Sequence, residues 1–145
     1  HDSGAFTGET SPLALKDLSI DFSLVGHSER RSIYGESNEA INAKLLNTLK
    51  HDLQCVLCIG ETLQERKDGK IFDVLTEQLT IGLKDFPKDK IDKLVIAYEP
   101  VWAIGTGEVA TPEQAQEAHS FIRNLLIEVF GDETAQVPLL YGGSV

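Results

Sequence analysis

The acid Glu99 closes an apolar run, and a carboxylate at that place could act as a general base. The run is KLVIAYE, residues 93–99, so its last side chain would be partly removed from water. Partial desolvation makes a carboxylate a more effective proton acceptor. The alternative is an ordinary ion pair at the rim of the fold, with Arg30 or Arg31 as its partner. The position at the end of a buried run favours the base.

His27 is a candidate hydrogen-bond donor because of what surrounds it in the chain. It follows Gly26 at the end of the run DFSLVG and precedes SERR at 28–31, which can begin a short helix. The amino terminus of a helix disfavours an imidazolium, so a neutral ring would be available as a donor. The alternative is a histidine that only caps a turn, and spacing leaves both open. His51 and His119 fall in helical patterns and are interpreted as surface or packing residues.

Residues 100–110, PVWAIGTGEVA, combine apolar side chains with two glycines, as a lid over a substrate would. In a permanently open loop, Trp102 and Ile104 would expose apolar side chains to water. Pro100 and Gly107 could bracket a segment that closes and excludes water from the site. The alternative is a loop packed permanently against a neighbouring helix.

Two glycine-rich turns could hold a phosphate. The sequences are GTG at 105–107 and YGGS at 141–144, and neither has the spacing of a dinucleotide-binding motif. Each is a weak signal alone. Together they offer backbone N–H groups, notably those of Gly105 and Ser144, to a single phosphate.

Four apolar runs alternate with helical patterns and predict the elements that position these residues. The runs are nearly continuous in apolar residues, as in strands buried on both faces, and occupy 21–26, 54–60, 93–99 and 137–143. Apolar residues recur with helical spacing after Ser37, after Gly69 and after the capping sequence TPEQ at 111–114. A shorter helix is expected to begin at Ser11 and Pro12.

The alternation of helix and strand predicts an α/β fold with a parallel sheet. Two arrangements remain possible, an open doubly wound sheet and a (β/α)₈ barrel. In both, chemistry collects at the carboxyl ends of the strands, so the candidate residues should share one rim. No repeat, linker or low-complexity tract interrupts the pattern. We expect residues 1–145 to be a single domain or part of one, cut at both ends.

Composition and charge exclude several classes of partner. The chain has a formal net charge of −10, which argues against nucleic acid or an acidic membrane. No apolar run approaches the roughly 20 residues of a membrane span. A small anionic substrate stays possible, because a few N–H groups can hold a phosphate locally. Cys55 and Cys58 have C-x-x-C spacing, but residues three apart on a strand face opposite sides, so we interpret them as buried thiols of a cytoplasmic protein.

The chain contains GAFTGE, GHSERR, CIGE, AYEPVWAIGTG and YGGS in that order, and together they resemble the triosephosphate isomerase family. The resemblance covers the whole chain, and AYEPVWAIGTG is among the most specific strings of that family. It implies a TIM (β/α)₈ barrel, incomplete in this chain, with about four βα units that correspond to strands four to seven. It also implies interconversion of dihydroxyacetone phosphate and glyceraldehyde 3-phosphate through an enediolate, with no cofactor and no metal.

The resemblance assigns roles to the candidate residues. Glu99 is the base that removes the proton next to the carbonyl, and His27 is the neutral electrophile that polarises that carbonyl. Gly105 and Ser144 supply phosphate-binding amides. Ile104 presses on Glu99 when the lid closes. The supports of the lid are expected to be Tyr98, Trp102, Glu61 and Tyr141.

The same resemblance implies a homodimer. The GAFTGE loop corresponds to an arm that enters a second subunit, with Thr7 near that subunit's site. Glu9 would pair with Arg30 across the interface. In the family, the residue at Glu29 neighbours a substrate-binding lysine.

Several features of the family have no counterpart among these motifs. A complete barrel needs about 250 residues, and the family's substrate-binding asparagine and lysine belong to its earlier strands. We therefore expect this chain alone to be inactive or nearly so. The hinge EVA at 108–110 replaces a lysine-containing version, which predicts altered lid rates. Two rival hypotheses are an aldolase-like barrel, although Lys93 lies at the wrong end of its strand for a Schiff base, and a non-catalytic half-barrel that pairs with another chain.

Overall fold

The chain folds around one parallel sheet, as the alternating pattern predicts. The computed structural model describes residues 1–145. Its strands are β1 (Phe22–Val25), β2 (Gln54–Ile59), β3 (Leu94–Tyr98) and β4 (Leu139–Tyr141), and they lie side by side in sequence order. All three pairings are parallel. Each predicted run contains its strand, and the observed strands end up to two residues inside the predicted bounds.

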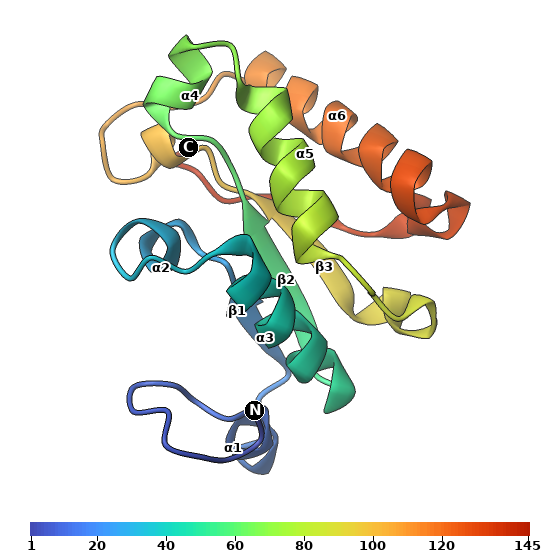
Figure 1. The fold of residues 1–145 in the computed structure, drawn as a ribbon. Helices are drawn as coiled ribbons and strands as arrows, with labels where there is room; N and C mark the ends of the chain where they lie inside the picture. The colour runs from blue at the N-terminus through green and yellow to red at the C-terminus, as the bar shows by residue number, and fades with distance from the viewer.

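The connections between the strands are helical (Figure 1). The long helices are α3 (Asn38–Lys50), α5 (Ile71–Gly82) and α6 (Pro112–Phe130). The short ones are α1 (Pro12–Asp17), α2 (Ser28–Ser32) and α4 (Leu63–Lys67), with 3₁₀ turns η1 (Lys88–Lys93), η2 (Val101–Ala103) and η3 (Asp132–Gln136). Thr111 and Gln114 form the predicted capping box of α6. None of these helices has the length and apolar character needed to cross a membrane.

Helices cover only one face of the sheet. In Figure 1, α3 and α5 lie in front of the strands, and α6 lies alongside α5. Alternate strand residues, such as Leu57 and Ile96, pack with helix residues such as Leu45 and Ile122 in a core of 17 buried residues. A doubly wound sheet would carry helices on both faces. The one-sided cover and the sequential strand order therefore match the barrel arrangement of the two predicted alternatives.

The opposite face of the sheet has no helix against it. A separate buried cluster on this face consists only of the strand residues Val56, Cys58, Val95 and Ala97. Leu24 and Leu140 flank this cluster and are 52% and 48% exposed. In a closed barrel this face points to the interior and packs against the remaining strands. The sheet is thus an incomplete, barrel-like part of an α/β fold.

The two cysteines face opposite sides of β2, as their spacing predicts. Cys55 belongs to the core beneath the helices, and Cys58 belongs to the cluster on the other face. Both are free and buried. Burial raises the pKa of the Cys55 thiol to about 12 and also raises the pKa of Cys58. Because the thiolate is the reactive and metal-binding form, both side chains are inert at neutral pH.

Candidate active site

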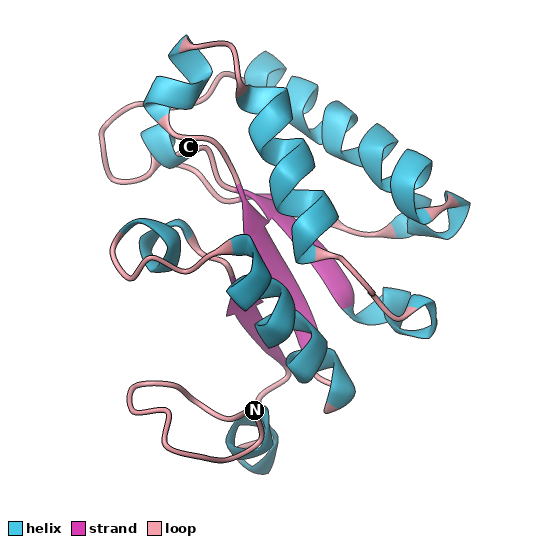
Figure 2. Ribbon diagram, viewed as in Figure 1, coloured by secondary structure: helices cyan, strands magenta, loops and turns pink.

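Loops from all four strands gather at the carboxyl end of the sheet (Figure 2). There Glu99, directly after β3, approaches His27, two residues after β1. The imidazole Nε2 lies 3.4 Å from one carboxylate oxygen of Glu99. The other oxygen accepts the backbone N–H of Ser28 at 3.3 Å. Although β2 separates β1 from β3, the two predicted residues are in direct contact.

His27 has the geometry of a neutral hydrogen-bond donor. It is the N-cap of α2, and its Nδ1 accepts the backbone N–H of Glu29 at 3.3 Å. A ring nitrogen that accepts a hydrogen bond carries no proton, so the proton of the neutral ring lies on Nε2. This is the nitrogen that faces Glu99. The His27 side chain is 32% exposed and Glu99 only 8%, so a ligand can approach the ring from solvent while the carboxylate stays buried.

Neither arginine that the sequence offered as an ion-pair partner bonds Glu99. Arg30 contacts the carboxylates of Glu9 and Glu36. Arg31 donates to backbone carbonyls and to an asparagine. The carboxylate of Glu99 is thus contacted by the Ser28 amide and the His27 imidazole, and the ion pair with Arg30 or Arg31 is not formed.

Gly60, after β2, allows the backbone of Glu99 to approach closely. A Cβ atom at Gly60 would lie 1.9 Å from the backbone oxygen of Glu99, which no side chain permits. The amide of Gln78 bonds both polar groups of Gly60, at 2.8 Å to its N–H and 3.2 Å to its carbonyl. Glu99 also donates its N–H to the carbonyl of Ile59 at 2.7 Å. Neither Gly60 nor Gln78 was predicted as a site residue, although the glycine of the motif CIGE was an available signal.

Glu61 anchors the start of the predicted lid. It is completely buried and accepts the hydroxyl of Tyr98 at 3.1 Å and the indole N–H of Trp102 at 2.8 Å. Arg66, which was not predicted, donates to the same carboxylate at 3.0 Å and lies over the Trp102 ring. Burial and the neighbouring Glu61 carboxylate raise the pKa of Tyr98, which stays a neutral donor. Three of the four predicted lid supports therefore meet in one buried group.

The far part of the lid is open to solvent. Ile104 is partly buried, whereas residues 105–109 are all exposed. Gly105 and Gly107 adopt φ angles of 66° and 83°, in the left-handed region that glycine occupies at little cost. No atom lies within 4 Å of a Cβ built at either glycine. This half of the loop has few contacts that would oppose its movement.

Ser144 lies beside the lid, but its amide is already bonded. Its N–H donates to the carbonyl of Ala103 at 2.8 Å, instead of being available with Gly105 as the sequence suggests. The hydroxyl of Tyr141 donates to the Ser144 carbonyl at 3.2 Å and makes no hydrogen bond with the lid. The Ser144 amide thus contacts the loop that contains Gly105, but because it is already bonded the two amides do not form a ready anion site.

The amino-terminal arm folds back on its own chain. Glu9 bonds Arg30 at 2.9 Å and Lys44 at 2.7 Å, and Glu36 bonds the same two cations. The family resemblance implies that the Glu9–Arg30 pair crosses a subunit interface. In this structure the pair forms within one chain, where Lys44 and Glu36 are further partners. Thr7 and the side chain of Glu29 are exposed.

Comparison with known proteins gives one consistent result. The family model described as triosephosphate isomerase matches residues 1–145. The chain is 52% identical over 143 residues to triosephosphate isomerase of Syntrophotalea carbinolica, covering 98% of the chain and 57% of the relative. It is 48% identical over 145 residues to the protein of that name from Idiomarina loihiensis, covering 100% of the chain and 58% of that relative. The chain thus spans under two thirds of the length of the curated relatives it matches.

Proposed function

We propose that this chain, which belongs to the triosephosphate isomerase family, carries the acid–base pair of an enzyme that interconverts dihydroxyacetone phosphate and glyceraldehyde 3-phosphate. The observation that carries the proposal is the 3.4 Å contact between Nε2 of His27 and the carboxylate of Glu99. A carbon acid beside a carbonyl is weak. A buried base and a fixed neutral donor at contact distance are the two groups that its ionisation requires.

The proposed reaction uses these two side chains and no cofactor or metal. Glu99 removes the proton from the carbon next to the carbonyl, while the Nε2–H of His27 donates to the carbonyl oxygen. The resulting enediolate receives the proton back from Glu99 on the neighbouring carbon. His27 moves a proton between the two oxygens of the intermediate. Substrate and product differ only in the position of hydrogen atoms, so nothing else is consumed.

Substrate binding must separate the two groups. The carbonyl oxygen has to occupy the position beside Nε2 that a Glu99 oxygen occupies here, 3.4 Å from the ring. Glu99 must also leave the N–H of Ser28 to reach the substrate carbon. We propose that closure of the lid brings Ile104 against the moved carboxylate. The apolar side chain then excludes water that would allow the enediolate to lose its phosphate.

The phosphate is proposed to bind the backbone amides of Gly105 and Ser144 after the lid closes. Ser144 must first release the carbonyl of Ala103, which shares the lid with Gly105. Backbone N–H groups bind an anion through local partial charges, so the net charge of −10 does not prevent it. Tyr141, once released from the carbonyl of Ser144, is proposed to support the closed loop, and Glu29 is proposed to support the site from the start of α2.

We propose that residues 1–145 form part of one barrel domain and that the active protein is a cytoplasmic homodimer. The large apolar side chains of Phe6, Ile33 and Tyr34 support a dimer, because they are 48%, 69% and 67% exposed around the arm. The loop with Thr7 and Glu9 would lie at that interface.

Residues 1–145 alone are expected to have little activity. The face formed by Val56, Val95 and their neighbours lacks the strands that would cover it, and half of a substrate cavity cannot enclose an enediolate. Steady-state turnover of the isolated chain measures this directly. Turnover within about tenfold of a complete barrel would contradict the expectation.

The catalytic assignment can be tested in a chimera in which residues 1–145 replace the matching segment of the Syntrophotalea carbinolica relative. Glu99→Gln keeps the size of the side chain and removes the base, so kcat should fall by about 10³-fold. His27→Gln removes the ring donor, and kcat should fall by about 10²-fold. Glu128→Gln, on the exposed face of α6, is the matched control and should retain full activity.

A non-catalytic scaffold would respond differently to the same variants. If Glu99→Gln and His27→Gln both retained the kcat of the Glu128→Gln control, the two residues would have no part in proton transfer. The proposed function would then be wrong. Circular dichroism and size-exclusion chromatography would establish that all variants share the fold of the parent chimera.

A further inference from the structure

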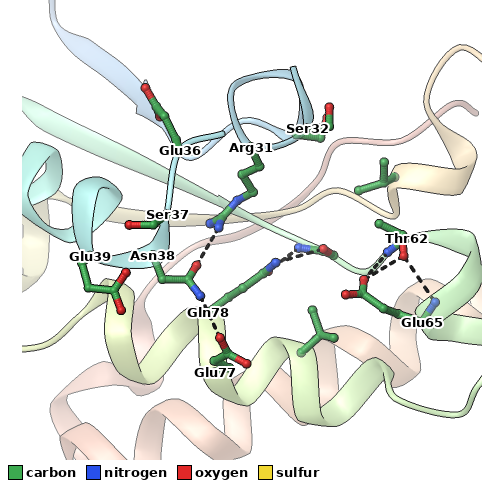
Figure 3. A pocket seen from close by; sticks show the side chains of 14 residues that line it. Arg31, Ser32, Glu36, Ser37, Asn38, Glu39, Thr62, Glu65, Glu77 and Gln78 are labelled. Carbon is green, nitrogen blue, oxygen red and sulfur yellow. Dashed lines mark hydrogen bonds between the residues drawn. The ribbon is translucent and has the colours of Figure 1, made fainter. Parts of the chain in front are cut away.

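A group of hydrogen-bonded side chains lines a cavity of about 470 Å³ (Figure 3). Figure 3 shows Arg31 pointing into this cavity toward Asn38, with Glu77 bonded in turn to Asn38. The cavity lies beside the carboxyl ends of the strands, since Ser28 and Gly60 also line it. None of the proposed catalytic steps uses Arg31.

Three hydrogen bonds fix the guanidinium of Arg31. Its Nε donates to the carbonyl of Gly26 at 2.7 Å, and its Nη2 donates to the carbonyl of Cys58 at 3.0 Å. Its Nη1 donates to the side chain of Asn38 at 2.6 Å. Because a guanidinium is planar and its donors have fixed directions, it holds the two backbone carbonyls at a set separation.

The two carbonyls belong to the strands that lead to the site. The parallel register of β1 and β2 ends at the pair Val25 and Leu57. Gly26 and Cys58 are the next residues of each strand, where φ of 78° at Gly26 turns the chain out of the sheet. The guanidinium of Arg31 therefore connects the two chain segments one residue beyond the last pair of β1 and β2. No strand pairing holds the segments together at that point.

One bridged segment leads along the chain to His27, and the other is joined to Glu99 by a backbone hydrogen bond. His27 follows Gly26 in the chain. Ile59 follows Cys58, and its carbonyl accepts the N–H of Glu99 at 2.7 Å. A shift of either bridged carbonyl would thus change the distance between the imidazole and the carboxylate.

The packing around the bridge leaves little freedom. A Cβ atom at Gly26 would lie 2.9 Å from Nη2 of Arg31 and 3.1 Å from the carbonyl oxygen of Cys58. Burial lowers the pKa of Arg31, and the nearby Cys58, Glu99 and Glu36 oppose that shift. An arginine stays protonated in proteins, so all of its donors are available for the bridge.

We propose that Arg31 is a positioning residue that sets the separation of His27 and Glu99 by bridging the ends of β1 and β2. The inference rests on the proposed function, because it assigns a role in the same reaction. Arg31 acts through the backbone and contacts neither the substrate nor the reacting atoms. Its loss should therefore lower kcat more than it changes KM.

The test uses Arg31→Ala in the chimera with the Syntrophotalea carbinolica relative. A small displacement of catalytic groups can cost up to about 10²-fold, so we expect kcat to fall by roughly 10- to 100-fold with little change in KM. Added guanidinium ion, far below unfolding concentrations, should restore part of kcat. The ion has the same planar donors, and removal of the Arg31 side chain would leave space for it in the wall of the cavity that Arg31 lines.

Two further variants separate positioning from folding. Arg31→Lys keeps the charge and the stem, but an ammonium cannot reproduce the planar bridge, so kcat should still fall at least about fivefold. Arg123→Ala is the matched control, because Arg123, on α6, also donates to a backbone carbonyl, that of Thr134, but bridges neither β1 nor β2. It should keep the parent kcat and show no response to guanidinium.

Several results would overturn the inference. If the folded Arg31→Lys variant matched the parent in kcat, the bridge would not position the pair, whatever the folding of Arg31→Ala. A loss of kcat that guanidinium does not reverse would assign Arg31 a purely structural role. If Glu99→Gln were also fully active, the proposed function itself would fail. Loss in Glu99→Gln with full activity in Arg31→Lys would reject only the role of Arg31.

Discussion

The candidate site has a proton-transfer side, whose residues are already in contact, and a phosphate side, whose amides are not yet arranged to bind an anion. On the proton-transfer side, His27 and Glu99 are already in contact, and their backbones are tied together through β2. On the phosphate side, Gly105 is exposed in a loop, and the N–H of Ser144 is occupied by Ala103. Contacts within this chain are enough to bring the proposed acid–base pair together. The anion site, in contrast, requires a rearrangement that breaks an existing hydrogen bond.

Of the two glycine substitutions proposed, Gly60→Ala should have the larger effect, because it affects the side of the site where His27 and Glu99 are in contact. The new Cβ would lie 1.9 Å from the backbone oxygen of Glu99, so the strand ends must move apart. We expect kcat to fall by up to about 10²-fold and the free energy of unfolding to fall by about 1–3 kcal/mol. Steady-state kinetics and urea unfolding of the chimera measure both. An unchanged kcat would mean that the close approach does not position the base.

Glu61→Gln should weaken the connection between the two sides. The carboxylate accepts hydrogen bonds from Tyr98, Trp102 and Arg66, and an amide offers only one oxygen to these donors. Leaving donors unpaired should lower the free energy of unfolding by about 1.5–3 kcal/mol. We expect kcat/KM to fall by roughly tenfold, or about 1.4 kcal/mol, as the lid loses its fixed end.

The control for this variant is Glu65→Gln. The side chain of Glu65 bonds only Thr62, in the capping box of α4, and its replacement should change kcat/KM by less than about twofold. Equal effects of Glu61→Gln and Glu65→Gln would show that the buried anchor has no special part in lid function.

Gly105→Ala should have the smallest effect. Space is available, since no atom lies within 4 Å of the added Cβ, but φ of 66° disfavours alanine by about 1 kcal/mol. We expect kcat/KM to fall by about fivefold, mainly through KM, and stability to change little. Stopped-flow binding of a phosphate-bearing substrate analogue would follow the lid. A loss of activity as large as that of Gly60→Ala would mean that the phosphate side of the site is as sensitive to a backbone change as the proton-transfer side.

The sequence was most informative where burial fixes the chain. The continuous apolar runs correctly predicted all four strands, and the position of Glu99 after such a run distinguished a buried acid from a surface one. The helix α4 was missed, although Thr62 and Glu65 carry the same capping signal as Thr111 and Gln114. Five residues were too short a stretch to show an apolar period.

The contacts that fix the site were harder to predict because they join side chains to backbone. Nothing in the type of Arg31 distinguishes a bridge between carbonyls from the ion pair that was considered for it. The engaged N–H of Ser144 has no sequence signal at all, because every residue except proline has a backbone donor. Such contacts depend on the register of strands, and a shift of one residue would remove them.

A crystal structure of the chimera with a phosphate-bearing enediolate analogue would test the central claim most directly. We predict that the Ser144 N–H leaves Ala103 and donates to the phosphate, while Glu99 leaves the N–H of Ser28. The bonds from Arg31 to Gly26 and Cys58 should stay intact, because that side is already assembled. A bound phosphate with the Ser144–Ala103 bond unbroken, or a bridge that opens on binding, would contradict the account.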